Sequence, residues 1–120
     1  MSTSPIGSKL AQAWHNHREG RNANAISEFQ SLLKSSPNDV DVYYGLGLAQ
    51  RADGQKEAAV ESFKQAGKLA KDAYDKLIAE AEASGRRVDH LLETTEDDRL
   101  MMMQRLIGQR LSELGVTVSE

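Results

Sequence analysis

The side chains best suited to metal binding or proton transfer are two histidines near the amino terminus, His15 and His17. Imidazole binds zinc and copper, and it changes charge near neutral pH. On an α-helix, residues two positions apart point about 200° away from each other. His15 and His17 therefore cannot share a metal ion from one helix, and the chain has no cysteine to supply a thiolate ligand or a nucleophile.

Three further segments have the residue types of a functional site but lack its spacing. Residues 45–50 begin like a dinucleotide-binding loop, yet they contain no third glycine and lie inside a helical pattern. Residues 96–98 (Glu-Asp-Asp) are better explained as the acidic first turn of a helix. Residues 86–87 (Arg-Arg) are an isolated basic pair. We therefore expect no catalytic residue, no cofactor and no metal, in a protein that is not an enzyme.

Length, charge and cysteine content restrict the class of protein. The chain has 120 residues, a formal net charge of −3 and no cysteine, so disulfide bonds are excluded. A mildly acidic chain lacks the basic character of most nucleic-acid binders. No apolar run approaches the roughly 18–20 residues of a membrane span, and no basic segment followed by an apolar stretch begins the chain. We expect one cytoplasmic domain over residues 1–120 that binds no nucleic acid and spans no membrane.

Residues that end helices divide the first part of the chain into four predicted α-helices. Apolar residues recur there at helical spacing among good helix formers. Pro5 suits the first position of a helix, whereas Pro37 disfavours helical geometry at the residue before it. Glycine commonly follows a helix. The predicted helices run from Pro5 to Gly20, from Asn22 to Ser35, from a cap at Asn38 or Asp39 to Asp53, and from Lys56 onward.

Residues of matching size and chemistry recur along these helices at a spacing of 34. The pairs are Ala13 and Gly47, Gly20 and Gly54, Ala25 and Ala59, Ile26 and Val60, and Phe29 and Phe63. Small residues allow two helices to approach closely, and the phenylalanines fill the space between successive helix pairs. A period of 34 with two helices in each unit resembles the tetratricopeptide repeat family.

The resemblance covers roughly residues 6–73, with one repeat over residues 6–39 and a second over residues 40–73. It implies an all-α fold in which antiparallel helix pairs stack into a right-handed superhelix. The first repeat has Lys9 and Gln12 where the family has an aromatic residue and a leucine, as is typical of a terminal repeat. The second repeat follows the family pattern at Tyr43, Leu46, Gly47, Ala59, Phe63 and Ala66.

The residues after the two repeats are expected to form C-terminal capping helices, because such repeats usually need at least three stacked units. Residues 74–93 are predicted to form a degenerate third-repeat or capping helix and a connector. Two interpretations of its start stay open, since the fourth helix either continues through Lys71 or breaks there. Residues 94–120 are predicted to form a methionine-rich helix that ends at Gly115, followed by a tail.

The resemblance implies that the first helix of each repeat lines a concave groove for a protein partner, bound as a peptide or an amphipathic helix. Exposed aromatic residues beside arginine are typical of interface anchors. One subgroup of the family binds the C-terminal carboxylate of chaperone tails with Lys and Asn at fixed groove positions. The matching positions here are Leu10, Trp14 and Gly45, so we expect the bound partner segment to be more apolar than such a tail. The implied groove residues are Leu10, Trp14, His17, Arg18, Asp41, Tyr44, Leu48 and Arg51.

A second function stays open, in which the C-terminal helix covers the groove and the chain is a structural subunit of a larger complex or of a homo-oligomer. Methionine side chains adapt to irregular contact surfaces. The final helix is apolar over more than one face, so part of it is free to contact another subunit. The predicted oligomer patch consists of Met101, Met102 and Leu106.

Overall fold

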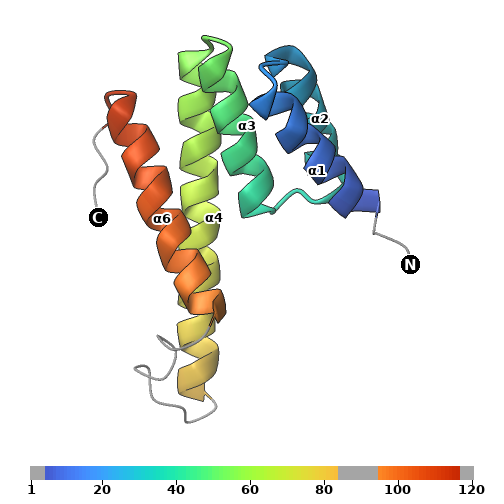
Figure 1. The fold of residues 1–120 in the computed structure, drawn as a ribbon. Helices are drawn as coiled ribbons and strands as arrows, with labels where there is room; N and C mark the ends of the chain where they lie inside the picture. Colours follow the sequence, from blue (N-terminus) through green and yellow to red (C-terminus); the bar gives the residue numbers. More distant parts are fainter. Residues whose placement is uncertain (1–4, 84–94, 117–120) are drawn as a thin grey trace. The chain divides into compact units, whose positions relative to one another are not determined.

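The computed structural model describes residues 5–83 and 95–116 and places most of them in α-helices (Figure 1). The helices are α1 (Pro5–Arg18), α2 (Asn22–Ser35), α3 (Val40–Ala52), α4 (Lys56–Ala83) and α6 (Thr95–Glu113). No strand occurs within these two ranges, which agrees with the expected all-α fold. Among the described helices, none is both long enough and apolar enough to cross a membrane.

Three glycines end helices as predicted. Gly20 follows α1, Gly54 follows α3 and Gly115 follows α6, with φ angles of 79°, 82° and 85°. Residues with a side chain rarely adopt this left-handed backbone, whereas glycine does so at little cost. The chain can therefore reverse direction directly after α1 and after α3.

The cap of α3 is Asp39, so of the two predicted candidates Asn38 is wrong. A carboxylate oxygen of Asp39 accepts hydrogen bonds from the backbone N–H groups of Asp41 and Val42, at 3.0 and 3.3 Å. These N–H groups have no partner inside the helix, and an aspartate at this position supplies one. The predicted start of α3 is thus explained by one side chain.

The turn that joins the two helices of a repeat has the same hydrogen bonds in both repeats. In each turn, two backbone N–H groups donate to carbonyl oxygens in the last turns of the first helix, at 2.9 to 3.1 Å. These bonds run from Gly20 to His17 and from Arg21 to Asn16 after α1, and from Gly54 to Arg51 and from Gln55 to Gln50 after α3. The 34-residue period is therefore present in the backbone as well as in the residue types.

A polar side-chain pair joins the two helices of each repeat at the same spacing. Asn16 of α1 donates a hydrogen bond from Nδ2 to the carboxylate of Glu28 on α2. The hydroxyl of Ser62 on α4 donates to Oε1 of Gln50 on α3, at 2.6 Å. Asn16, Gln50 and Ser62 are buried, so these bonds satisfy polar groups that water cannot reach.

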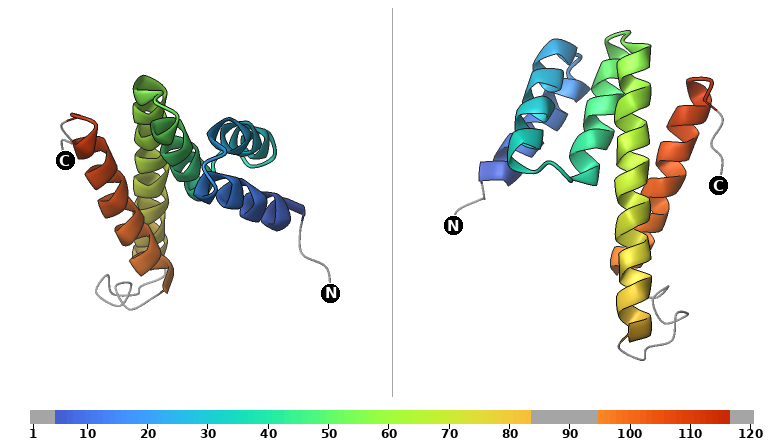
Figure 2. Two further views of the ribbon diagram at one scale, coloured as in Figure 1. Left: turned by 45° about the horizontal axis from the view of Figure 1, so that its top comes forward. Right: turned by 180° about the vertical axis from the view of Figure 1, so that it is seen from behind.

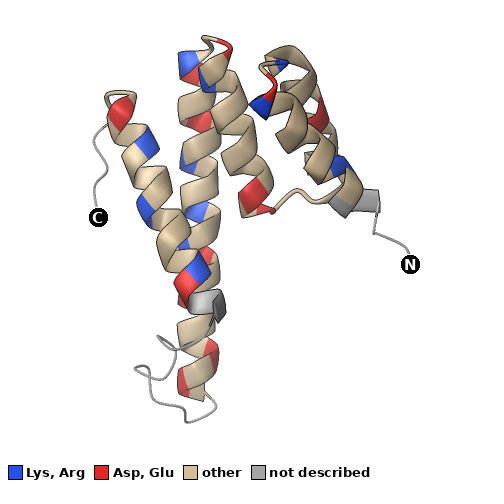
Figure 3. Cartoon of the chain, in the orientation of Figure 1, with Lys and Arg blue, Asp and Glu red and all other residues tan. Residues whose placement is uncertain are grey.

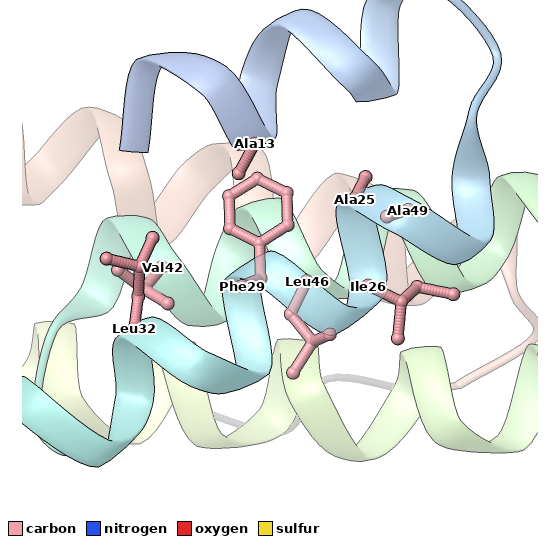
Figure 4. Close-up of a cluster of buried hydrophobic side chains, with 8 residues drawn as sticks. All are labelled: Ala13, Ala25, Ile26, Phe29, Leu32, Val42, Leu46 and Ala49. Carbon is pink, nitrogen blue, oxygen red and sulfur yellow. The ribbon is translucent and has the colours of Figure 1, made fainter. Parts of the chain in front are cut away.

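The core of the first helices is built around the ring of Phe29, which is completely buried. Ala13 of α1 lies over this ring in Figure 4, so a small residue of one helix meets a large residue of the next. Leu10, Trp14 and Leu33 are partly buried and pack against this cluster. The buried members of the cluster are Ala13, Ala25, Ile26, Phe29, Leu32, Val42, Leu46 and Ala49.

Two glycines of α3 lie directly against the phenylalanines of the repeats. A Cβ atom added to Gly45 would lie 2.5 Å from the ring of Phe29. One added to Gly47 would lie 2.6 Å from the ring of Phe63. The absence of side chains at these two positions therefore lets α3 approach the aromatic rings of α2 and α4 closely.

Helix α4 runs without a break from Lys56 to Ala83. Of the two interpretations of Lys71, the continuous helix is correct. The predicted boundary between residues 73 and 74 thus lies within one helix. The chain divides into two compact units between Ala66 and Gly67, so α4 contributes to both. The helical turn predicted within residues 86–93 lies outside the described residues.

In the second unit, α6 runs beside the part of α4 that belongs to this unit (Figure 2). A Cβ atom added to Gly67 of α4 would lie 3.3 Å from Cγ2 of Ile107 on α6. Leu100, Ile107 and Leu111 are buried side chains of α6, and they lie at the helical spacing of one face. One face of α6 therefore belongs to a core, as its sequence pattern predicts.

Candidate partner-binding surface

The predicted groove residues come from α1 and α3, the first helices of the two repeats. On each helix they recur at positions i, i+4 and i+7, which lie on one helix face. Arg18 is exposed, and the other members are half-buried. We use the name α1–α3 surface for Leu10, Trp14, His17, Arg18, Tyr44, Leu48 and Arg51. Asp41, the remaining predicted groove residue, is half-buried in the first turn of α3.

Equivalent positions of the two repeats carry an aromatic residue and a leucine in exchanged order. Leu10 corresponds to Tyr44 and Trp14 corresponds to Leu48, each at a spacing of 34. Each helix therefore presents one aromatic ring and one leucine, one helical turn apart. All four side chains are half-buried, so each has an inner part in contact with the protein and an outer part open to solvent.

The ring of Trp14 is held in place by aromatic contacts. It meets Phe29 edge to face at a centroid distance of 5.4 Å, and it meets His17 in a similar way at 6.0 Å. A Cβ atom added to Gly45 would lie 3.1 Å from Cζ2 of Trp14, so glycine at this position makes room for the ring. Trp14 therefore combines a packing role with a partly exposed face.

Tyr44 rests on the phenylalanine of the second repeat. Its ring lies 5.7 Å from that of Phe63, and the two ring planes are tilted by 55°. Aromatic pairs at such distances add about 0.5–1.5 kcal/mol beyond the area that they bury. The buried phenylalanines of both repeats thus support the aromatic residues of the α1–α3 surface.

Arg18 and Arg51 form a cationic end of the α1–α3 surface, which also includes His17. His17 and Arg18 lie in the last turn of α1, and Arg51 lies in the last turn of α3. Burial lowers the pKa of His17 below its ordinary value of 6.5, and the positive charges of Arg51 and Arg18 lower it further. The Nδ1 atom of His17 is buried and has no hydrogen-bond partner.

The lowered pKa of His17 predicts that the fold loses stability on acidification. The unfolded chain takes up this proton at a higher pH than the folded chain, so the free energy of unfolding should decrease as pH falls through 6.5. Urea denaturation between about pH 8 and about pH 5 measures this change. The variant His17→Gln should show a smaller decrease than the parent chain.

The matched control for this measurement is His15→Gln, because His15 lies on the same helix but is exposed. It should follow the pH dependence of the parent chain. An equal decrease in the parent chain and in His17→Gln would contradict the effect assigned to His17.

Two shallow hollows open on the first unit, and neither is lined by a member of the α1–α3 surface. They have volumes of about 420 and 390 Å³. Within residues 5–83 and 95–116, no group of three or more His, Asp or Glu side chains could hold a metal ion. The hollows are lined by residues 20–24 with Asp53, and by Gln12, Asn16, Arg21, Asn24, Ser27 and Glu28.

The predicted oligomer patch is only partly exposed. Met101 and Met102 have exposed fractions of 41% and 55%, and they are the large apolar side chains exposed in the described part of the chain. Leu106 is half-buried. The exposed side of α6 therefore combines these two methionines with polar residues such as Asp98, Arg105 and Gln109.

Sequence reasoning missed two features that shape the α1–α3 surface. The sequence pattern places Gly45 only in a loop-like motif and at a groove position of the family. In the structure, its lack of a side chain makes room for the rings of Trp14 and Phe29. The polar pairs between helices were not predicted, although Asn16 and Gln50 are both amides at a spacing of 34. That chemical match is the signal by which the pairs could have been found.

Comparison with known proteins adds one finding to this geometry. A family model described as tetratricopeptide repeat matches residues 17–81, more than half of the chain. No curated protein and no solved structure matches the chain. The matched range contains the last two residues of α1, all of α2 and α3, and α4 up to residue 81. The chain belongs to the tetratricopeptide repeat family.

Proposed function

We propose that this chain is a non-enzymatic interaction module that binds a peptide or an amphipathic helix of a partner protein on its α1–α3 surface. Tetratricopeptide repeats generally mediate protein–protein interaction. The observation that carries the proposal is the paired arrangement of aromatic residue and leucine on α1 and α3. Each aromatic ring rests on a phenylalanine and has an outer part free for contact.

The apolar centre of the surface supplies binding energy, and its cationic end supplies orientation. Trp14 and Tyr44 offer rigid apolar area that loses little conformational freedom on binding, and Leu10 and Leu48 extend it. Arginine at one end favours a segment with an acidic flank. A partner segment that is apolar along one stripe and acidic at one end fits this pattern.

We further propose how the domain is divided. The repeats span residues 6–39 and 40–73 and form the start of a right-handed superhelix. Residues 74–93, together with the helix and tail of residues 94–120, act as its C-terminal cap. The buried face of α6 supports this role, because it gives the second unit a core of its own.

The groove proposal predicts different effects for two adjacent tyrosines of α3. Tyr43 and Tyr44 are both half-buried, but helical geometry turns their side chains about 100° apart. Truncating an interface anchor commonly costs 2 kcal/mol or more, so Tyr44→Ala should lower partner affinity at least about thirtyfold. Tyr43→Ala should leave that affinity within about threefold of the parent value.

Affinity capture from the cells that naturally make the chain, quantified by mass spectrometry, measures this difference. Circular dichroism first confirms that both variants keep the parent helix content, since Tyr44 also contacts Phe63. Equal loss of the same partner from both variants, or undiminished capture by Tyr44→Ala, would contradict the proposal.

The exposed methionines of α6 favour a second candidate function, self-association or assembly into a larger complex through Met101, Met102 and Leu106. Sedimentation of Met101→Glu with Met102→Glu tests it, because charges on an apolar contact should dissociate the assembly. The exposed Arg105 supplies the control Arg105→Glu on the same helix. A parent chain that sediments as a monomer, or a doubly substituted chain of unchanged mass, would rule out a homo-oligomer through this patch.

A further inference from the structure

The exposed side of α6 matches the segment expected on the α1–α3 surface, which is apolar along one stripe and acidic at one end. We propose that the partner held by this surface is α6 of a second copy of the same chain, bound through Met101 and Met102. The inference rests on the proposed function of the surface and names the segment that it binds.

Methionine is the apolar residue that α6 offers to another molecule. Met101 and Met102 are the large apolar side chains exposed in the described part of the chain. They are adjacent in one helix, so their side chains point about 100° apart and cover a broad strip. The sulfur atom of methionine makes favourable contacts with aromatic rings. The α1–α3 surface offers two such rings, because Trp14 and Tyr44 are only half-buried.

Opposite charges lie one helical turn from the apolar residues of these two surfaces. On α6, the exposed Asp98 precedes Met102 by four positions. On α1, the exposed Arg18 follows Trp14 by four positions. Helix α1 contains basic residues but no Asp or Glu (Figure 3). Each charge is therefore about 6 Å along the helix axis from its apolar neighbour, so the two surfaces match in spacing as well as in sign.

The matched spacing fixes the direction of the bound helix. With Asp98 beside Arg18, Met102 reaches Trp14 only if the bound α6 runs antiparallel to α1. Helices α1 and α3 run in a similar direction (Figures 1 and 2). The exposed Arg105 of the bound helix then lies toward the first turn of α3, which contains Asp41. Opposite charges thus meet at both ends of the contact, which favours this direction.

The contact joins two different surfaces, so it is heterologous. Each copy has one α6 and one α1–α3 surface, and it can therefore bind one neighbour through each. A first contact leaves one α6 and one α1–α3 surface unoccupied at the ends, so assembly continues into longer series or closes into a ring. A contact between the methionines of two copies would instead be symmetric and would stop at a dimer.

Sedimentation velocity of two complementary variants tests the inference. Met101→Glu with Met102→Glu, the α6 variant, removes the apolar strip of α6 and keeps the α1–α3 surface. Tyr44→Ala, the surface variant, removes an anchor of that surface and keeps α6. We expect the parent chain to grow beyond the monomer between about 1 µM and about 1 mM, and each variant alone to stay monomeric. An equal mixture of the two variants should form a dimer that grows no further, because only one intact contact is available.

The controls separate loss of the contact from loss of the fold. Gln30→Glu with Ser31→Glu adds the same two charges at exposed positions of α2 and should assemble like the parent chain. Circular dichroism checks the helix content of each variant. Leu48→Ala serves as a second surface variant if loss of the contact between Tyr44 and Phe63 unfolds the first.

Exchange of the two charges tests the direction of the bound helix. Arg18→Glu alone and Asp98→Arg alone should each weaken the association of the parent chain about fivefold, because like charges then meet. A chain that carries both changes should associate within about twofold of the parent value. Losses that add instead of cancelling would contradict the antiparallel arrangement.

The outcomes separate this inference from the proposed function. A parent chain that stays monomeric at about 1 mM, a surface variant that assembles like the parent, or a mixture that forms no dimer overturns the second copy as partner. In these cases the proposed function stands if capture of a different protein from cells depends on Tyr44. Equal capture of every protein, second copies included, by Tyr44→Ala and Tyr43→Ala overturns both.

Discussion

Replacing Phe29 with alanine is expected to lower the free energy of unfolding by about 3–5 kcal/mol, a large part of the roughly 5–15 kcal/mol typical of a folded domain. The ring is completely buried and contacts the helices before and after its own, through Ala13 and the backbone at Gly45. Alanine leaves a cavity beside Ala13 and Gly45. These two residues have no longer side chain that could fill it, so the cost should lie at the upper end of this range.

Urea denaturation followed by circular dichroism measures this loss. The emission of Trp14, the only tryptophan, should change in the same variant because its ring loses the edge contact with Phe29. The control Met102→Ala removes an exposed side chain and should change stability by no more than about 0.5 kcal/mol. A loss below about 1 kcal/mol for Phe29→Ala would contradict the central position assigned to this ring.

Alanine at Gly45 or Gly47 is expected to destabilise the fold by about 1–3 kcal/mol, although the same change in an ordinary helix stabilises it by about 0.5–1 kcal/mol. The reason is steric. The new Cβ atom would lie 2.5 Å from the buried ring of Phe29 or 2.6 Å from that of Phe63, so the packed helices would have to move.

Gly108 of α6 provides the matched control for this change of sign. It also lies inside a helix, but nothing beyond the adjoining backbone of α6 lies within 4 Å of its added Cβ, so Gly108→Ala should stabilise the chain. Combining Gly47→Ala with Phe63→Leu should cost less than the sum of the two single changes, because the smaller side chain relieves the clash. Stabilisation by Gly47→Ala would contradict the close approach of α3 and α4.

The fold of the first unit could be predicted well because its signals are local or periodic. Glycine after a helix acts through its own backbone, and aspartate before a helix acts by accepting hydrogen bonds from nearby backbone N–H groups. Gly20 and Asp39 both act in this way. The spacing of 34 residues between Phe29 and Phe63 indicates a repeated packing unit, and the match to the tetratricopeptide repeat model agrees with this repeat.

The features that escaped prediction depend on contacts between distant residues. Helical propensity on both sides of Lys71 is similar, so the sequence leaves open whether α4 ends there, and only the structure shows that it continues to Ala83. Gly45 has no side chain from which a contact could be predicted. Its role, to leave room for two aromatic rings, follows from the positions of Trp14 and Phe29. The α1–α3 surface itself stays a prediction, because a binding function depends on the partner as well as on the exposed side chains.

Site-specific crosslinking tests the central claim most directly, because it reports which face of the repeats meets another protein. A photoreactive phenylalanine analogue placed at residue 48 lies on the α1–α3 surface, and one placed at residue 30 lies at an exposed position of α2. After irradiation in the cells that naturally make the chain, we expect a partner protein crosslinked from residue 48, in a yield that Tyr44→Ala lowers, and none from residue 30. The same product from both positions, or a product from residue 30 alone, would contradict binding at the α1–α3 surface.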